Sequence, residues 1–248
     1  MTSSVLPVAI LAGGLATRLQ PITTSIPKAL IEVAGEPFIR HQLRLLRSNG
    51  VTRVVVCVGH LGQLIDDVIR TRPVEGLDIQ VRFDGPHLLG TAGALRAAAP
   101  ALGNAFFVLY GDSYLTCDFR QVQAAFEASH KLGLMTVFRN EGRWDTSNIE
   151  FQAGRIIAYD KRAPTRQMRH IDYGLGVLKS AALASVPEWK AYDLALLYQD
   201  LLGRCQLGGY EVGERFYEIG SLEGLQETRM FLGSSGAQLV EVHGDLQR

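Results

Sequence analysis

Val5-Leu6-Pro7-Val8-Ala9-Ile10-Leu11 is an apolar run that leads directly into Ala12-Gly13-Gly14. An apolar run of this length that ends in adjacent glycines is typical of a buried strand entering a loop. Two more apolar runs follow at residues 54–58 and 105–110. The first half of the chain is therefore expected to contain buried strands.

Helical patterns separate these strands. Residues 37–47 place Phe38, Leu43, Leu45 and Leu46 among Arg40, His41, Gln42 and Arg44, which predicts an amphipathic helix. Further helices are expected at residues 61–70 and 91–99, and a strand at residues 79–83. Strands separated by helices of this length pair in parallel through right-handed crossovers. The pattern predicts an α/β fold with a doubly wound, mostly parallel sheet flanked by helices.

The second half of the chain is less regular. It predicts strands at residues 134–138, 148–151, 155–159 and 172–178, and helices at residues 192–202 and 222–232. No repeat or linker interrupts the chain, so one domain is expected over residues 1–233. The polar, glycine-punctuated residues 234–248 are expected to form a C-terminal tail.

The composition argues against several classes of protein. The 248 residues carry 25 Lys and Arg against 25 Asp and Glu, so a zero net charge argues against broad binding to nucleic acid or membrane. The three cysteines, Cys57, Cys117 and Cys205, form no disulfide framework or C-x-x-C pair. Neither a signal peptide nor a membrane span is evident. These observations predict a soluble, cytoplasmic protein and leave its oligomeric state open.

The loop after the first strand has the chemistry of a phosphate site. Adjacent glycines let backbone N–H groups approach a ligand, and Arg18 and Lys28 add two cations that suit a triphosphate. The spacing matches neither the Rossmann fingerprint nor the P-loop.

Taken together, Leu11 to Leu19, Pro21, Pro27-Lys28 and Leu30 resemble the signature of the sugar-1-phosphate nucleotidyltransferases, L-A-G-G-x-G-T-R-L followed by a proline and P-K-x-L. Later segments resemble other motifs of the family in the expected order: residues 89–95, Tyr110-Gly111-Asp112, Asp160-Lys161, Asp172-Tyr173-Gly174 and residues 216–221. The resemblance implies a Rossmann-like nucleotidyltransferase fold, similar to that of GT-A glycosyltransferases. The chain departs from the family pattern at Ala16, where glycine is usual, and at Glu218, where aspartate is usual.

The resemblance also implies the roles of the site residues. Mg²⁺ is expected to be held by Asp112 and Glu218. Arg18, Lys28 and Asp112 are the expected catalytic residues. The expected nucleotide-binding residues are Leu11, Ala12, Gly13, Gly14, Thr17, Gly90 and Thr91. The expected sugar-phosphate-binding residues are Gly111, Asn148, Lys161, Asp172 and Gly174. The turn at residues 144–148 is expected to close over the sugar. His60, His87 and His170 lack metal-ligand spacing, so surface or hydrogen-bonded positions are expected for them.

The implied reaction joins an NTP to a sugar 1-phosphate and releases pyrophosphate by in-line displacement at the α-phosphorus. The loop at residues 89–93 looks most like that of mannose- and heptose-type guanylyltransferases, which favours GTP and a manno-configured hexose or heptose 1-phosphate. Two alternatives stay open. One is a non-catalytic subunit that senses nucleotide sugars. The other is a GT-A-type glycosyltransferase, which the missing second aspartate in Asp112-Ser113-Tyr114 disfavours.

Overall fold

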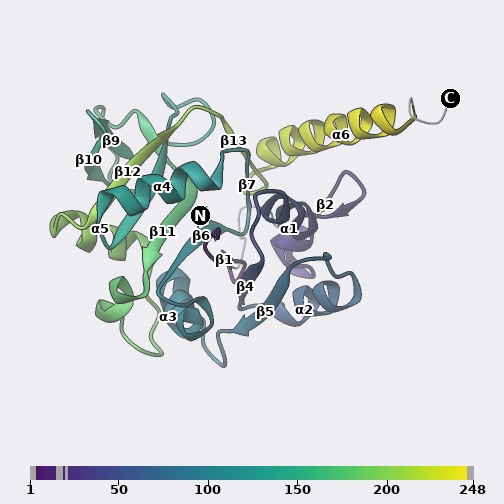
Figure 1. Cartoon of the computed structure of the whole chain (residues 1–248), viewed down its shortest axis with the longest axis horizontal. Helices are drawn as coiled ribbons and strands as arrows, with labels where there is room; N and C mark the ends of the chain where they lie inside the picture. Colours follow the sequence, from purple (N-terminus) through teal and green to yellow (C-terminus); the bar gives the residue numbers. More distant parts are fainter. Residues whose placement is uncertain (1–3, 15–18, 20–21, 245–248) are drawn as a thin grey trace.

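In the described part of the chain, nine strands form a mixed sheet at the centre of the molecule (Figure 1). The computed structural model describes residues 4–14, 19 and 22–244. The strands of the sheet are β1 (Val8–Leu11), β4 (Arg53–Val58), β5 (Asp78–Phe83), β6 (Ala105–Tyr110), β8 (Gly133–Arg139), β9 (Ile149–Gln152), β10 (Arg155–Tyr159), β11 (His170–Lys179) and β12 (Leu207–Val212). β1 pairs in parallel with β4 and β6, whereas β11 runs antiparallel to β6 and β8. The predicted parallel core is confirmed, and β11 makes the sheet mixed.

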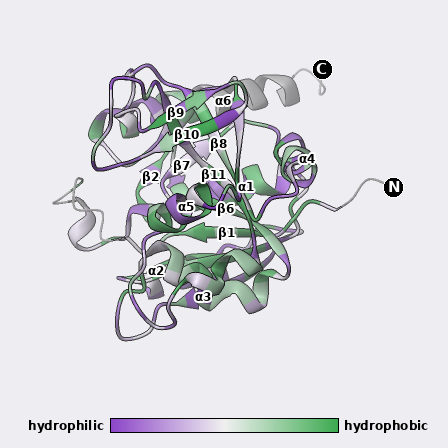
Figure 2. Ribbon diagram, turned by 90° about the vertical axis from the view of Figure 1, so that its left-hand side faces the viewer, coloured by the Kyte–Doolittle hydropathy of each residue, from purple (hydrophilic) through white to green (hydrophobic). Residues whose placement is uncertain are grey.

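Helices cover both faces of this sheet. They are α1 (Phe38–Ser48), α2 (Gly62–Thr71), α3 (Gly90–Leu102), α4 (Phe119–Ser129) and α5 (Leu194–Gly203), whereas α6 (Leu222–Gly244) packs against residues 32–33 and 216–218 outside this sheet. Val8 and Ile10 of β1 pack with α1, α2 and α4, whereas Ala9 faces the opposite side and packs with α3 and α5. Alternate side chains of a strand point to opposite faces, so one short strand contributes to both halves of the core. Figure 2 shows the hydrophobic colour gathered along the central strands.

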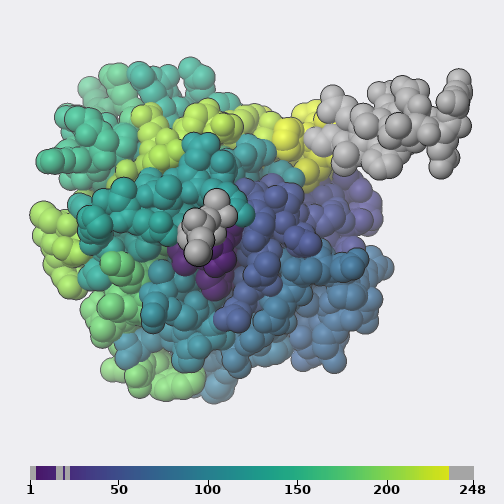
Figure 3. Space-filling model, viewed as in Figure 1, coloured from purple at the N-terminus to yellow at the C-terminus, as the bar shows by residue number. Residues whose placement is uncertain are grey.

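The two halves of the chain lie against each other. In Figure 3 the purple and blue residues of the first half form the right side of the body, and teal and green residues form the left side. α6 begins at Leu222 as expected and continues beyond residue 233, so a helix covers most of the stretch expected as a tail. Among the described residues, no helix combines the length and the hydropathy that a membrane span requires.

Several elements were not expected from the sequence. They are the two-stranded sheets β2 (Glu32–Val33) with β3 (Glu36–Pro37) and β7 (Ser113–Leu115) with β13 (Phe216–Glu218), together with β12 and α4. β12 contains Gly208 and Gly209, and glycines weaken the pattern of a strand. A Cβ at Gly209 would lie 2.7 Å from the ring of Phe151, so close packing with β9 requires a glycine there.

One polar residue of α1 departs from the amphipathic pattern of this helix. Gln42 is fully buried on the apolar face of α1, together with Phe38 and Leu46. The three residues are spaced four apart, and residues at this spacing share one face of a helix.

Candidate active site

Asp112 and Lys28 form an ion pair at the end of β6. Lys28 begins the short 3-10 helix η3 (Lys28–Leu30), and its Nζ lies 2.8 Å from Asp112 Oδ2. Burial alone would raise the pKa of Asp112, but the Lys28 ammonium outweighs it and holds that pKa below its ordinary value. Asp112 is therefore ionised at neutral pH.

The turn that carries Asp112 is held by backbone contacts from distant parts of the chain. Gly111 N donates to Leu11 O at 3.0 Å, and Ile219 N donates to Asp112 O at 2.9 Å. A Cβ at Gly111 would overlap Leu11 O, so the close approach to β1 requires a glycine. Gly111 therefore serves the backbone geometry of the turn.

Glu218 approaches the same turn from β13, where it pairs with Ser113 of β7. Its carboxylate accepts hydrogen bonds from Gly220 N and, at 2.5 Å, from Ser221 Oγ. A Cβ built on Gly220 would lie 2.5 Å from Glu218 Oε2, 3.3 Å from Lys28 Nζ and 3.4 Å from Asp112 Oδ2. The structure thus brings both carboxylates and the lysine together around Gly220, and Glu218 also binds the start of α6.

These donors fit a metal ion that is completed by a substrate. Asp112 and Glu218 supply carboxylate oxygens, and Mg²⁺ in phosphate-binding sites commonly takes one or two carboxylates together with phosphate oxygens. No cluster of three or more His, Cys, Asp or Glu side chains suited to a metal occurs in the described part of the chain. The arrangement therefore suits an ion that arrives with a phosphate-bearing ligand better than a permanent structural metal.

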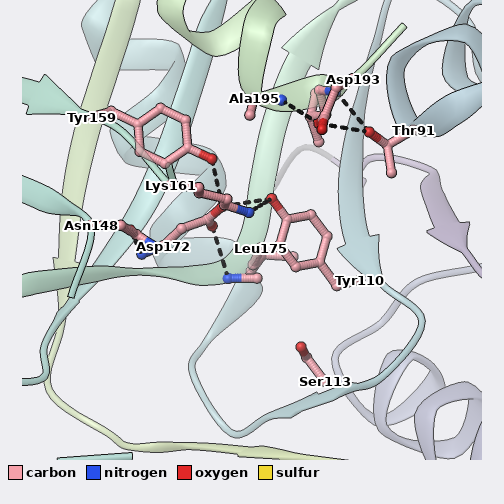
Figure 4. Close-up of polar contacts among 12 residues, drawn as sticks. Thr91, Tyr110, Ser113, Asn148, Tyr159, Lys161, Asp172, Leu175, Asp193 and Ala195 are labelled. Carbon is pink, nitrogen blue, oxygen red and sulfur yellow. Dashed lines mark hydrogen bonds and ion pairs between the residues drawn. The ribbon is translucent and has the colours of Figure 1, made fainter. Parts of the chain in front are cut away.

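A second polar cluster surrounds Asp172 on β11 (Figure 4). Asp172 Oδ2 accepts from Tyr110 Oη at 2.6 Å and from Tyr159 Oη at 3.4 Å, and lies 3.1 Å from Lys161 Nζ. The Asp172 side chain is 3% exposed, whereas that of Lys161 is 40% exposed. Burial alone would lower the pKa of Lys161, but Asp172 raises it above its ordinary value. Lys161 is therefore a fixed cation with an open side.

Four of the five residues expected to bind the sugar phosphate, Asn148, Lys161, Asp172 and Gly174, come together at this cluster, whereas Gly111 lies in the Asp112 turn. Asn148 Oδ1 accepts from Asp172 N at 3.1 Å, and Gly174 N donates to Asp172 Oδ1 at 3.1 Å. Burial and the nearby Asp172 also raise the pKa of Tyr110 well above its ordinary value, so its hydroxyl stays protonated. The Asp172 carboxylate contacts Lys161 and the two tyrosines, and it therefore holds the Lys161 ammonium in place.

The described residues among those expected to bind the nucleotide lie at the carboxyl end of β1 and at the start of α3. Ala12 N donates to Cys57 O at 2.9 Å, which holds the segment from Leu11 to Gly14 against β4. Gly90 has a φ of +68°, and a Cβ there would lie 2.8 Å from Tyr192 O. Thr17 and Arg18, and the departure at Ala16, lie outside the described residues.

Thr91 contacts α5 through its side chain (Figure 4). Its hydroxyl accepts from Leu194 N at 2.7 Å and donates to Asp193 Oδ1 at 3.3 Å. Ala92 N donates to Tyr192 O at 2.9 Å. The start of α3 is thus bound to the start of α5, and the Thr91 hydroxyl serves this junction.

Two further expectations concern side chains near the site. The Trp144 ring packs against Phe138, and the two ring centroids are 5.6 Å apart. The guanidinium carbon of Arg215 lies 4.4 Å from the centroid of the Trp144 ring. These contacts anchor the turn at residues 144–148. His170 Nε2 lies 3.1 Å from Glu211 Oε1, so the expected hydrogen-bonded position is confirmed for this histidine.

Sequence reasoning missed the roles of Gln42 and Tyr110. Gln42 Nε2 donates to Tyr110 O at 2.9 Å and to Ser113 O at 2.8 Å. Its spacing from Phe38 and Leu46 was a signal of burial. Tyr110 immediately precedes Gly111-Asp112, but nothing in the sequence shows that its hydroxyl reaches a strand 62 residues away.

Comparison with known proteins gives concordant matches. Residues 8–147 match the family model described as Nucleotidyl transferase. Mannose-1-phosphate guanyltransferase beta-B of Xenopus laevis is 30% identical over 182 residues, which cover 70% of this chain and 50% of that protein. Mannose-1-phosphate guanyltransferase 2 of Candida glabrata is 37% identical over 125 residues, which cover 49% of this chain and 34% of that protein. The chain thus spans about half or less of the length of these relatives.

Solved structures show the same fold. HddC from Yersinia pseudotuberculosis complexed with GMP-PN matches with a TM-score of 0.76 and 23% identity, over 92% of this chain and 99% of that chain. The inositol-1-phosphate CTP transferase from T. maritima matches with a TM-score of 0.75 and 19% identity, over 94% of this chain and 97% of that chain. At these identities the likeness concerns the fold.

Proposed function

The chain belongs to the nucleotidyl transferase family, and from this premise we propose that it transfers a nucleotidyl group from an NTP to a sugar 1-phosphate. The observation that carries the proposal is the meeting of Lys28, Asp112 and Glu218 around Gly220 at the end of β6. Ligands of open α/β sheets bind beyond the carboxyl ends of the strands, which is where these three side chains lie. A cation beside two carboxylates suits a site for phosphate groups.

The reaction needs positioned charges and no covalent enzyme intermediate. An oxygen of the sugar phosphate attacks the α-phosphorus of the NTP as the bond to the β-phosphate oxygen breaks, and the electron pair leaves with pyrophosphate. Lys28 would stabilise the phosphates at the reacting centre, and Lys161 would bind the sugar phosphate. Arg18, identified from the sequence, would stabilise the leaving pyrophosphate. Mg²⁺ held by Asp112 and Glu218 would neutralise charge between the two substrates.

For the substrates we propose GTP and a manno-configured hexose or heptose 1-phosphate. The support comes from the loop at residues 89–93 and from the sequence relatives named as mannose-1-phosphate guanyltransferases. The solved structures of this fold carry names with different bases, so the fold adds nothing to the choice of base.

Pyrophosphate release tests this proposal. The purified chain is mixed with Mg²⁺, each of the four NTPs and a panel of hexose and heptose 1-phosphates. We expect release with GTP and a manno-configured sugar phosphate, and none in Asp112→Asn. The variant loses a partly exposed charge at the end of β6 and should keep the wild-type unfolding temperature within a few degrees.

Three results would contradict parts of the proposal. Release with another base only would overturn the choice of GTP. Nucleotide-sugar binding without release in any combination would favour the non-catalytic sensing subunit. Unchanged turnover in Asp112→Asn at saturating Mg²⁺ would remove Asp112 from the reaction.

A further inference from the structure

Gln42 is a fully buried amide on a helix face that is otherwise apolar. Its neighbours on this face of α1 are Phe38, Ile39, Leu43 and Leu46. A buried polar side chain is unfavourable unless its hydrogen-bonding groups find partners. The partners of Gln42 therefore indicate why an amide stands at this position.

Both partners belong to the turn that carries Asp112. Gln42 Nε2 donates to Tyr110 O at 2.9 Å and to Ser113 O at 2.8 Å, the carbonyls on either side of Gly111-Asp112. Because both partners are acceptors, the amide nitrogen must face them, and the orientation of the side chain is determined.

The other end of the amide is left without a partner. Gln42 Oε1 is buried and accepts no hydrogen bond from the residues that the structure describes. An unsatisfied buried acceptor destabilises a fold, so the unpaired Oε1 offsets part of what the two hydrogen bonds from Nε2 contribute to stability. Gln42 is thus poorly suited to a role in stability alone.

We propose that Gln42 is a positioning residue that sets the place of the Asp112 carboxylate. The inference rests on the proposed function, because it assigns to Gln42 the geometry of the site that would carry out the transfer. The turn is then held from three directions: by Gln42 on α1, by Leu11 O on β1 and by Ile219 N after β13. Without the two amide hydrogen bonds, the Tyr110 and Ser113 carbonyls lose their donor and the turn loosens.

A displacement of the turn would reach both halves of the site. Asp112 contacts Lys28, and the Tyr110 hydroxyl contacts Asp172 beside Lys161. A shift near 1 Å at a reacting group can reduce turnover about a hundredfold. Gln42 is fully buried and its amide donates only to the carbonyls of Tyr110 and Ser113, so its effect on catalysis passes through the turn.

The test compares Gln42→Met with Gln123→Met. Methionine has a similar length and removes both N–H donors. Gln123 on α4 is also buried and also bonds backbone, accepting from Leu6 N at 3.0 Å and donating to Ser4 O at 3.3 Å, but it lies away from the turn. Gln123 Nε2 also donates to Glu127 Oε1 at 3.0 Å, so Gln123→Met loses at least as many hydrogen bonds as Gln42→Met, at a different place.

Turnover and amide hydrogen exchange are measured for both variants. We expect Gln42→Met to reduce kcat between about tenfold and a hundredfold, with KM for the NTP changed less than threefold. In the ligand-free protein, the Gly111 and Ile219 amides should exchange faster. Gln123→Met should keep kcat within about twofold of the wild type and leave both amides unchanged, even if its unfolding temperature falls further.

Two results would overturn the proposal: wild-type kcat with wild-type exchange in Gln42→Met, or equal losses of kcat in the two variants. If Gln42→Met does not fold, Gln42→Asn replaces it, since its shorter amide cannot reach both carbonyls, and the same two readouts decide. If the wild type transfers no nucleotide at all, the proposed function fails, while the exchange of the two amides still shows whether Gln42 holds the turn.

Discussion

A Cβ built on Gly224 in the first turn of α6 would overlap Glu218 Oε1. Glu218 can therefore fold its carboxylate against the start of the helix only because residue 224 has no side chain. The same carboxylate accepts from Gly220 N and Ser221 Oγ. The Glu218 carboxylate therefore packs closely against both Gly220 and Gly224, and neither position has room for a side chain.

Gly224→Ala should separate helix stability from activity. Replacing glycine by alanine inside a helix usually stabilises it by about 0.5–1 kcal/mol. Here the new methyl group would displace the Glu218 carboxylate, so we expect activity to fall about tenfold, as measured by pyrophosphate release. The control is Gly233→Ala in the same helix, where nothing lies within 4 Å of the added Cβ. It should raise the unfolding temperature and keep full activity. Equal activity in the two variants would show that the position of the Glu218 carboxylate does not matter.

Glu218 itself is tested by two substitutions. Glu218→Gln keeps the length but offers a neutral oxygen, a poorer ligand for a hard cation, so the Mg²⁺ concentration for half-maximal activity should rise steeply. Glu218→Asp is one methylene shorter and would give up its contacts with Gly220 N and Ser221 Oγ, so activity should fall about tenfold or more. Full activity in Glu218→Gln would remove Glu218 from the site. Full activity in Glu218→Asp alone would show that the backbone of β13 suits the shorter acid.

Lys161→Met should weaken binding of the sugar phosphate selectively. A hydrogen bond to a charged group contributes about 1.5–3 kcal/mol to binding. Its loss should therefore raise KM for the sugar 1-phosphate about tenfold or more, whereas KM for the NTP should change less. Lys131→Met is the control, because Lys131 Nζ bonds only Leu207 O among the contacts described, away from this cluster. Steady-state kinetics with each substrate varied in turn gives both constants. An equal rise in both KM values would assign Lys161 to the nucleotide as well.

Asp84→Asn should stabilise the fold at neutral pH. Asp84 is buried at the end of β5, and burial raises its pKa although Leu89 N donates to Oδ2 at 3.1 Å. An acid whose pKa is raised by folding destabilises the protein when ionised, so the penalty is full above the raised pKa and disappears below the ordinary value of 3.8. Asparagine can still accept from Leu89 N, so the unfolding temperature at pH 7 should rise by about 2 °C or more.

The gain in Asp84→Asn should shrink as the pH is lowered towards 3.8. Asp78→Asn at the exposed start of the same strand is the control and should change stability little at any pH. Thermal unfolding between pH 3.5 and 7 measures both variants. A gain that does not depend on pH would show that the charge of Asp84 is not the cause.

The sequence predicts the parallel core well because apolar runs and glycine turns are local signals. The strands β1, β4, β5 and β6 begin and end within about three residues of their predicted bounds. α4 was missed although Asp118 caps it by accepting from Arg120 N at 2.8 Å, a signal that aspartate before a helix commonly gives. β12 was missed because its glycines are explained only by the strands that pack on it.

The candidate site shows the same division between local and distant signals. The motifs identified Asp112, Glu218 and Lys161, and the structure brings the first two together beside Lys28. The roles of Gln42 and Asp172 depend on partners in other elements: carbonyls in one case, a lysine and two tyrosines in the other. A single sequence does not show which buried polar groups will meet.

The triple anchoring of the Asp112 turn also bears on how the chain folds. Gln42 lies 68 and 71 residues from the two carbonyls that it binds, and Lys28 lies 84 residues from Asp112. Contacts between such distant residues form late, because the loops between them must first close. Ile219 contributes its anchor only after most of the chain has left the ribosome. A nascent or truncated chain that lacks β13 would therefore lack both Glu218 and the hydrogen bond from Ile219 N to Asp112 O, and the group of charges around Asp112 would be incomplete.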